Sequence, residues 1–344
     1  MAVESGARNQ RGVALLIALV ILTLAATLAA AMIWDTGLDV RRTANLLQGD
    51  QAREYALGAE AWAQQILRRD FEAAAHTAQT PQQPGAAAGT SVNLTQDWAM
   101  QLPPLPVEGG SVRGQLQDLQ GLFNVNNLVN AQATPTAQSV AFTQFQRLLT
   151  ALDLEPGIAN AVLDWVNPGD QPHYPGGAKD ETYTRLQPPY HTAERPMTSI
   201  TELLLVAGVT PEVYRKLEPY VCALPVASLP QPAAGGASST ITVNVNTAPP
   251  LVLMSLAPNL DLGTATALAQ NLATHPIEDA AALNSVWAQL TGGQRVPDNA
   301  GITSSYFRLT ATVQIGSAHL TLYSLLYRNA SGGTFAIRRT FGTL

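Results

Sequence analysis

The 344-residue chain contains one cysteine, Cys222, and few charged residues. A single cysteine cannot form an intrachain disulfide, so the fold is held without covalent cross-links. We expect Cys222 to be a small buried residue, because the sequence shows no paired base that would activate a thiol. Charged residues make up only 13% of the chain and the formal net charge is −6. This balance argues against a nucleic-acid partner.

Motifs of the common enzyme classes are also missing. The chain has no GxSxG elbow, no GxGxxG and no P-loop. Its five histidines are scattered without metal-ligand spacing, and no EF-hand pattern is present. We therefore predict no catalytic residues and expect the chain not to be an enzyme.

One long apolar run, residues 12–34, stands out against this background. It contains no charged residue. As a helix it would span roughly 33 Å, enough for a bilayer core of about 30 Å. Arg8 and Arg11 precede it, which predicts that the N-terminus stays in the cytoplasm and the rest of the chain lies outside. The run is longer than the apolar region of a secretory signal peptide, and Gly12 offers a site for leader removal from the cytoplasmic side.

The helical pattern continues beyond the predicted membrane segment as far as Arg69. The residues of its apolar stripe, spaced by three and four, are Ala52, Tyr55, Ala59, Trp62 and Ile66. A helix from Val13 to Arg69 would be roughly 85 Å long. We expect its first half to lie in lipid or among neighbouring helices and its second half to pack on a soluble head. The alternative is an ordinary signal anchor followed by a stalk helix.

The hydrophobic period of the remaining chain predicts an α+β fold. Residues 112–119 alternate as a strand, and so do 306–315, 319–328 and 334–340. The segments between them that are predicted to be helical are 142–152, 158–166, 200–208, 211–221, 249–257, 262–273 and 278–290. The prediction is a long helix packed on a small antiparallel sheet, with a large helical insertion after the first strand.

Two Asn-x-Asn turns, at 123–126 and 243–246, each precede a group of short helices. They predict two related helical modules, joined by a Pro- and Gly-rich linker at 229–240. The paired short helices resemble SAM-like or helix-hairpin-helix modules. The hairpins AGVTPE and APNLDLG carry no Lys or Arg for phosphates, so we expect them to serve packing rather than DNA binding. Residues 76–90 are predicted to be a flexible loop.

The N-terminal junction resembles that of type IV prepilins and type II secretion pseudopilins. In those families a prepilin peptidase cuts after the glycine and the new N-terminus is methylated, which implies cleavage between Gly12 and Val13 here. Most members carry glutamate five residues into the mature chain, whereas this chain has Ile17. The large minor pseudopilin of the K type is similar in lacking that glutamate.

The resemblance to K-type pseudopilins extends over nearly the whole chain. The stretches that carry it, after the leader junction, are DLQGLFNVN, LDWVNPGD, GGAKDETY, PPYHTAE, SITELLLVAG, VNVNTAPP and YFRL. It implies a pilin-type helix-and-sheet core that carries a large helical domain. The predicted division is leader 1–12, transmembrane helix 13–35, pilin-like helix and first strand 36–122, first module 123–228, linker 229–240, second module 241–300 and final strands 301–344.

An acidic loop after the first module's helices is the candidate metal site. Its candidate ligands are Asp164, Asn167, Asp170, Asp180, Glu181 and Glu194. Ca²⁺ binds six to eight oxygens, and a loop of roughly thirty residues needs something to order it. The family resemblance also implies structural calcium here. However, Lys179 stands where an acid is usual, and Glu194 where Asn is usual. A lysine could lie against the carboxylates and reduce the affinity, so solvated or ion-paired loop charges are the alternative.

Ile17 suggests a position within a filament. A glutamate in a hydrocarbon bundle is costly unless it pairs with a neighbour's amino terminus. In pilin-like filaments this pairing draws each subunit into register with the subunit ahead. A subunit at the tip has none ahead and needs no acid. We therefore expect a non-enzymatic subunit that caps a periplasmic pseudopilus and initiates its assembly.

The expected location is the bacterial inner membrane, with one span and the head in the periplasm. The expected partners are other minor pseudopilins, the prepilin peptidase and, in addition, secreted substrates, with no nucleic acid. The alternatives are a minor pilin of a type IV pilus and a membrane-anchored periplasmic binding module.

Overall fold

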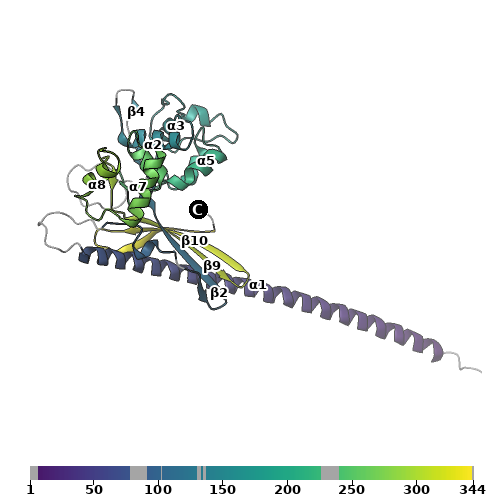
Figure 1. Ribbon diagram of the computed structural model, residues 1–344. Coiled ribbons are helices and arrows are strands. Elements are labelled where there is room, and N and C mark those ends of the chain that lie inside the picture. The colour runs from purple at the N-terminus through teal and green to yellow at the C-terminus, as the bar shows by residue number, and fades with distance from the viewer. Residues whose placement is uncertain are drawn as a thin grey trace, which may run out of the picture.

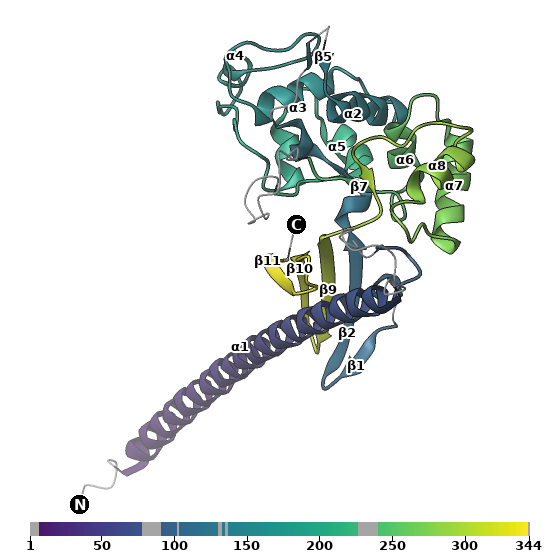
Figure 2. The same ribbon diagram turned by 90° about the vertical axis from the view of Figure 1, so that its left-hand side faces the viewer.

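The computed structural model describes residues 7–77, 91–101, 103–129, 133–134, 137–225 and 240–342. Its longest element is the helix α1, Ala7–Thr77, with 71 residues and a length of about 105 Å. Residues 13–37 are all exposed, and this half stands clear of the rest of the molecule (Figures 1 and 2). The helix is longer at both ends than the predicted Val13 to Arg69. Its C-terminal extension is rich in alanine, which favours helix, and contains no Pro or Gly.

The second half of α1 packs on a five-stranded antiparallel sheet with the order β1-β2-β9-β10-β11. The strands are β1 Leu105–Val107, β2 Gly110–Asp118, β9 Tyr306–Ile315, β10 Ala318–Arg328 and β11 Thr334–Phe341. The four predicted strands are thus confirmed. The fifth, β1, is not among the strands that the sequence predicts. It contains Pro106, which is tolerated because β1 is an edge strand.

Small side chains let α1 approach the sheet closely. Ala52, Ala56 and Ala63 are buried against the inward-facing residues of β9, among them Phe307 and Val313. The Trp98 ring meets Phe307 edge-on, with the ring centroids 5.5 Å apart. The predicted apolar stripe therefore faces the sheet, although Trp62 at its margin remains 50% exposed.

Glu60 fixes α1 to the last two strands. Its carboxylate accepts hydrogen bonds from Ser324 Oγ at 2.6 Å and from Arg339 Nε and Nη2 at 2.8 and 2.7 Å. Burial alone would raise the pKa of Glu60, but the hydrogen bonds from Arg339 and Ser324 outweigh it and lower the pKa. The side chain is thus a charged buried link between helix and sheet.

We expect Glu60→Gln to lower the free energy of unfolding by about 2 kcal/mol, because it leaves Arg339 without its carboxylate partner. The loss is smaller than for a fully buried pair since Arg339 is half exposed to water. Urea denaturation of the full chain in detergent measures it. Glu54→Gln, an exposed substitution on the same helix, is the control. Equal stability of the two variants would contradict the assignment.

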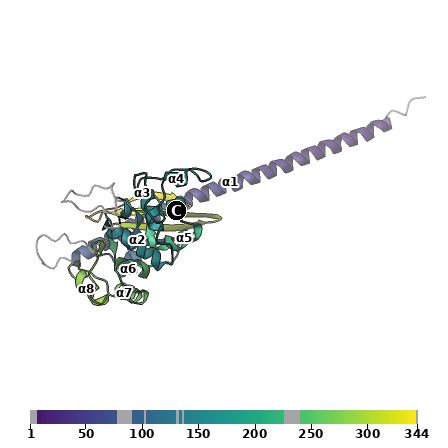
Figure 3. The same cartoon turned by 90° about the horizontal axis from the view of Figure 1, so that it is seen from above.

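The helical region lies above the sheet, with α1 below (Figures 1 and 2), and in the view from above it covers part of the sheet (Figure 3). Its α-helices are α2 Val140–Ala151, α3 Ile158–Val166, α4 Asp180–Tyr183, α5 Pro211–Leu217, α6 Pro250–Leu256, α7 Leu262–Thr274 and α8 Leu283–Leu290. The helix predicted after Ser199 is instead a 3-10 helix, Ile200–Leu205. Ser199 and Glu202, which stand at capping-box spacing in the sequence, form that capping box at its start. Gly208, with positive φ, follows too soon for a longer α-helix.

Each half of this region begins and ends with a short strand, and in each half these two strands pair with one another. The strand β3, Phe123–Asn124, pairs in parallel with β6, Val221–Cys222, and β7, Val243–Asn244, pairs in parallel with β8, Ala300–Gly301. In the first half, the Asn126 side chain accepts from Met197 N at 2.7 Å and donates to Met197 O at 2.9 Å.

The second half repeats this pairing. The Asn246 side chain accepts from Ile277 N at 2.9 Å and donates to Ile277 O at 2.9 Å. Each Asn-x-Asn turn therefore ends on an asparagine that bonds both backbone groups of a distant residue. The two halves meet where α2 packs on α6.

Asp118, at the end of β2, joins the sheet to the second half. It is fully buried and accepts hydrogen bonds from Ser304 Oγ and Thr247 Oγ1, both at 2.6 Å, from Asn244 Nδ2 at 2.9 Å and from Gln120 N at 2.8 Å. Burial raises the pKa of Asp118, while these four bonds oppose the rise.

A small apolar cluster beside this joint includes Leu119, Leu224 and Cys222. Cys222 is buried as predicted, and burial raises the pKa of its thiol far above the usual range. Of the predicted loop at 76–90, all but the first two residues lie outside the described part of the chain, and so does the predicted linker apart from Thr240.

Candidate functional site

The first candidate site is the bare half of α1, residues 13–37, which are all exposed. The described helix contains an 18-residue window with a mean hydropathy of 2.8, none of which is buried. Val13 and Ile17 are 56% and 54% exposed. Gly12 lies inside the helix. An exposed apolar surface of this length is stable only when lipid or neighbouring helices cover it.

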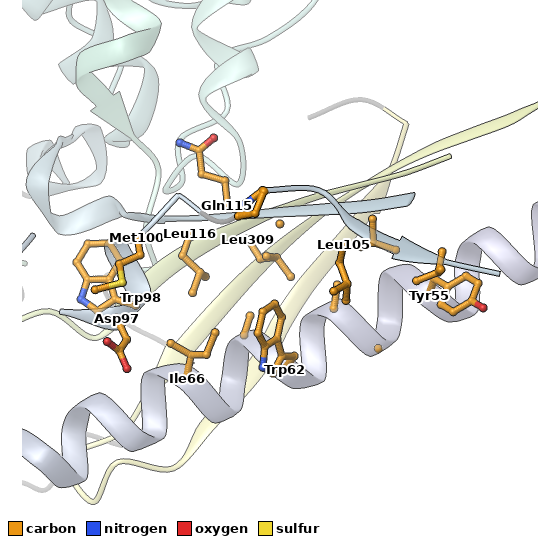
Figure 4. A pocket seen from close by; sticks show the side chains of 17 residues that line it. Tyr55, Trp62, Ile66, Asp97, Trp98, Met100, Leu105, Gln115, Leu116 and Leu309 are labelled. Atoms are coloured by element: carbon orange, nitrogen blue, oxygen red, sulfur yellow. The ribbon is translucent and has the colours of Figure 1, made fainter. Parts of the chain in front are cut away.

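A second feature is an apolar groove between α1 and the β1–β2 edge of the sheet. Figure 4 shows side chains from both walls pointing into it. Trp62 and Ile66 line it from α1, Leu105 and Leu116 from the strands, and Trp98 closes one end. Trp62 and Leu105 are at least half exposed. The groove is thus a second exposed apolar surface on α1.

The acidic candidates do not share one loop as predicted. Asp164 lies inside α3 and is only 1% exposed. Its Oδ1 lies 2.5 Å from His173 Nδ1, and its Oδ2 accepts from His173 N at 3.0 Å. The carboxylate is thus already bound by the start of the following loop.

Lys179 is 5% exposed and reaches the end of the same helix. Its ammonium donates to Asp164 O at 2.7 Å and to Asn167 O at 2.6 Å. The carbonyls of a helix's last turn have no partner within the helix and carry partial negative charge, so a cation there is favourable. The sequence suggests that Lys179 lies against the loop carboxylates, but both hydrogen bonds of its ammonium go to backbone carbonyls.

Asp180 begins the short helix α4 and accepts hydrogen bonds from His191 Nδ1 at 2.6 Å and from Thr192 N and Oγ1, both at 2.8 Å. These bonds lower the pKa of Asp180 to about 2. Glu181 pairs with Arg185 on the surface. Asp170 and Glu194 are exposed, and Glu194 is fixed by its backbone bond to Trp165 O.

The described residues therefore do not form a calcium-type ligand set in this arrangement. No group of three or more His, Cys, Asp or Glu side chains among them is placed to hold a metal ion. Two carbonyl oxygens are bonded to Lys179, and the carboxylates of Asp164 and Asp180 are bonded to histidines. Calcium binding at the six candidate residues stays a prediction that these contacts do not support.

Sequence reasoning missed what orders this segment. Trp165, Tyr183 and Tyr190 form an aromatic cluster with ring centroids 5.3 to 6.2 Å apart. Tyr183 Oη accepts from Ala207 N, and burial raises the pKa of Tyr183 to about 12. The sequence contains these aromatic residues and the acids and histidines that pair at 164 and 173 and at 180 and 191, but no local pattern predicts the contacts between them.

We expect acid to loosen this segment between about pH 4 and pH 2, because the pKa of Asp180 is depressed. A depressed carboxyl stabilises the fold above its unfolded pKa, and this contribution is lost as pH falls through the folded value. Amide hydrogen exchange in residues 180–192 measures it. Asp180→Asn should remove the pH dependence. An unchanged profile in that variant would contradict the assignment.

These features define a pilin-like subunit: a long helix, apolar and bare in its first half, packed on an antiparallel sheet. Two family models described as "Type II secretion system (T2SS), protein K" match residues 121–226 and 243–305. The chain belongs to the type II secretion system protein K family.

The relatives cover nearly the whole chain. Type II secretion system protein K of Klebsiella pneumoniae is 34% identical over 346 residues, which are 97% of each chain. That of Aeromonas hydrophila is 30% identical over 97% of this chain and 98% of its own. A chain of the GspK-GspI-GspJ complex from enterotoxigenic Escherichia coli matches with a TM-score of 0.62 and 23% identity, over 88% of this chain and 100% of that one. The last match shows the fold.

Proposed function

We propose that this protein is the minor pseudopilin that caps the tip of a short periplasmic filament in type II secretion and helps to initiate its assembly. Family membership supports a structural role in secretion. The observation that carries the tip position is Ile17, which lies on the bare half of α1 where related pilin-type subunits carry an acid. The helical region, read as two SAM-like modules, adds bulk above the sheet that would hinder a further subunit from stacking there.

The tip position is tested by restoring the acid with Ile17→Glu. A glutamate at this depth is costly unless it meets the amino terminus of a subunit ahead. The variant should therefore enter the filament body or fail to assemble, and secretion should fall. Ile17→Leu is the matched control. Normal secretion and an unchanged ratio of this protein to the major subunit in sheared filaments would contradict the proposal.

The proposed membrane arrangement places the N-terminus in the cytoplasm and the head in the periplasm. A prepilin peptidase then cuts between Gly12 and Val13, and the new amino terminus is methylated. Intact mass and N-terminal sequence, with and without the peptidase, measure this. A chain that starts at methylated Val13 only when the peptidase is present is the expected result. A chain that keeps Met1, or is cut after the apolar run, would leave a plain anchored domain.

The proposed partners are other minor pseudopilins, because the solved relative forms a complex of GspK with GspI and GspJ. The groove beside Trp62 supports a contact along this part of α1, because it is an exposed apolar surface on the same helix. Trp62→Glu should abolish co-purification with the other minor pseudopilins without lowering the melting temperature. Gln65→Glu, an exposed polar position on α1 outside the groove, should leave co-purification intact. Loss in both variants, or in neither, would contradict this contact.

A further inference from the structure

The segment between α3 and the 3-10 helix at Ile200–Leu205 is long, irregular and nevertheless packed. A segment of this kind needs specific contacts to hold it against the entropy of a free chain. Three kinds are visible: the aromatic cluster around Tyr183, the two carboxylate–histidine pairs and the ammonium of Lys179. Of these, only the Lys179 ammonium joins the C-terminal end of α3 to the start of α4 through a buried positive charge.

We propose that the Lys179 ammonium is the structural cation of this segment and that it takes the place of a metal ion. Its two acceptors are the carbonyl oxygens of Asp164 and Asn167, at 2.7 and 2.6 Å. Backbone carbonyls on an irregular turn are among the ligands that calcium uses. Here an amine of this chain neutralises the same oxygens.

The surroundings of Lys179 leave a metal ion few free ligands. The nearby Asp164 carboxylate is bonded through both oxygens to His173. Gly177 packs directly over this pair, since a Cβ atom there would lie 2.0 Å from His173 O and 2.3 Å from Asp164 Oδ2. The carboxylate therefore cannot turn toward another cation without displacing the backbone above it. An ion entering beside the ammonium would also meet a like charge.

The exposed acids of this segment do not supply the missing ligands for a metal ion. Asp170 and Glu194 face solvent, and Glu181 pairs with Arg185. Solvated or surface-paired carboxylates bind calcium weakly unless other oxygens converge on the same point. Lys179 thus supplies permanently what a metal would supply only when bound, and the segment should hold its structure in the presence of a chelator.

The first experiment compares the full chain in detergent with calcium chloride and with EDTA. The melting temperature and the amide hydrogen exchange of residues 167–198 should be the same in both. A melting temperature several degrees higher in calcium, the shift that a ligand at a hundred times its Kd produces, would overturn the proposal.

The second experiment uses the two lysines of the chain, Lys179 and Lys216. Lys216 is exposed, so an amine-acetylating reagent should modify it rapidly. Lys179 should react at least ~10-fold more slowly, in EDTA as in calcium, because its amine is buried and bonded. Equal reactivity of the two lysines in EDTA would overturn the proposal without the need for any variant.

The third experiment removes the charge. Lys179→Met should speed amide exchange in residues 167–198 by at least ~10-fold, since one buried and one partly buried carbonyl lose the bond from the ammonium. Lys216→Met is the matched control and should leave exchange unchanged. Wild-type exchange in Lys179→Met would overturn the proposal. If that variant fails to fold, the acetylation rates of the wild-type chain decide.

Discussion

Asp118→Ala is expected to lower the free energy of unfolding by about 4 kcal/mol, because four donors, three of them buried, lose one shared acceptor. The donors come from three parts of the chain: Gln120 beside β2, Asn244 and Thr247 in the second half of the helical region, and Ser304 before β9. The substitution should therefore loosen the joint between the sheet and the helical region. Urea denaturation of the full chain measures the total loss.

The chemistry of this joint distinguishes Asp118 from an ordinary buried residue. Asp118→Asn keeps the shape but faces at least one donor with its amide NH₂ group, and we expect about half the loss of the alanine variant. Asp170→Asn, an exposed change of the same kind, should stay within about 0.5 kcal/mol of the wild type. A loss below about 1 kcal/mol for Asp118→Ala would contradict the role of this carboxylate.

Asn126→Ala and Asn246→Ala are each expected to lower the free energy of unfolding by about 3 kcal/mol, since each leaves a buried backbone N–H without its acceptor and removes a donor from a buried C=O. Ile277 O keeps a second hydrogen bond, from Ser91 Oγ at 2.8 Å. The two variants should lose protection against amide exchange in different segments. The Asn126 variant should raise amide exchange around Met197, and the Asn246 variant around Ile277. This difference follows from the equivalent but separate contacts of the two turns.

A double variant of these asparagines adds a sharper test. Because the two sites lie in separate halves, their losses should add to within about 0.5 kcal/mol. Asn271→Ala, on the exposed face of α7, is the matched control and should leave both segments protected. If either single variant exposed both segments equally, the two halves would be one cooperative unit rather than two.

The sheet could be predicted from sequence because its pattern is local. Alternation in residues 306–315 places every second residue on one face, and the structure buries that face against α1. Its residues are Phe307, Leu309, Ala311, Val313 and Ile315. The edge strand β1 could not be predicted, because Pro106 argues against a strand unless the strand is known to lie at an edge. That knowledge comes only from the complete sheet.

The acidic segment shows the limit more clearly. The sequence identifies its acids and the unusual Lys179, but the partner of each charge depends on where α3 ends and how the chain returns to it. Lys179 bonds carbonyl oxygens of the last turn, which no residue type encodes. His173 and His191, scattered along the sequence, lie against Asp164 and Asp180 only after the chain has folded back.

The position of β2 in the sheet determines the order in which the parts of the protein can fold. In the complete sheet β2 lies between β1 and β9, and Asp118 stands opposite Phe307 near the end of the chain. During synthesis from the N-terminus, the helical region emerges before the sheet is complete, and the inward face of α1 stays uncovered until the final strands arrive. A chain interrupted before β9 would therefore expose two apolar surfaces at once, the bare half of α1 and the stripe that the sheet normally covers, and would be a ready target for proteases.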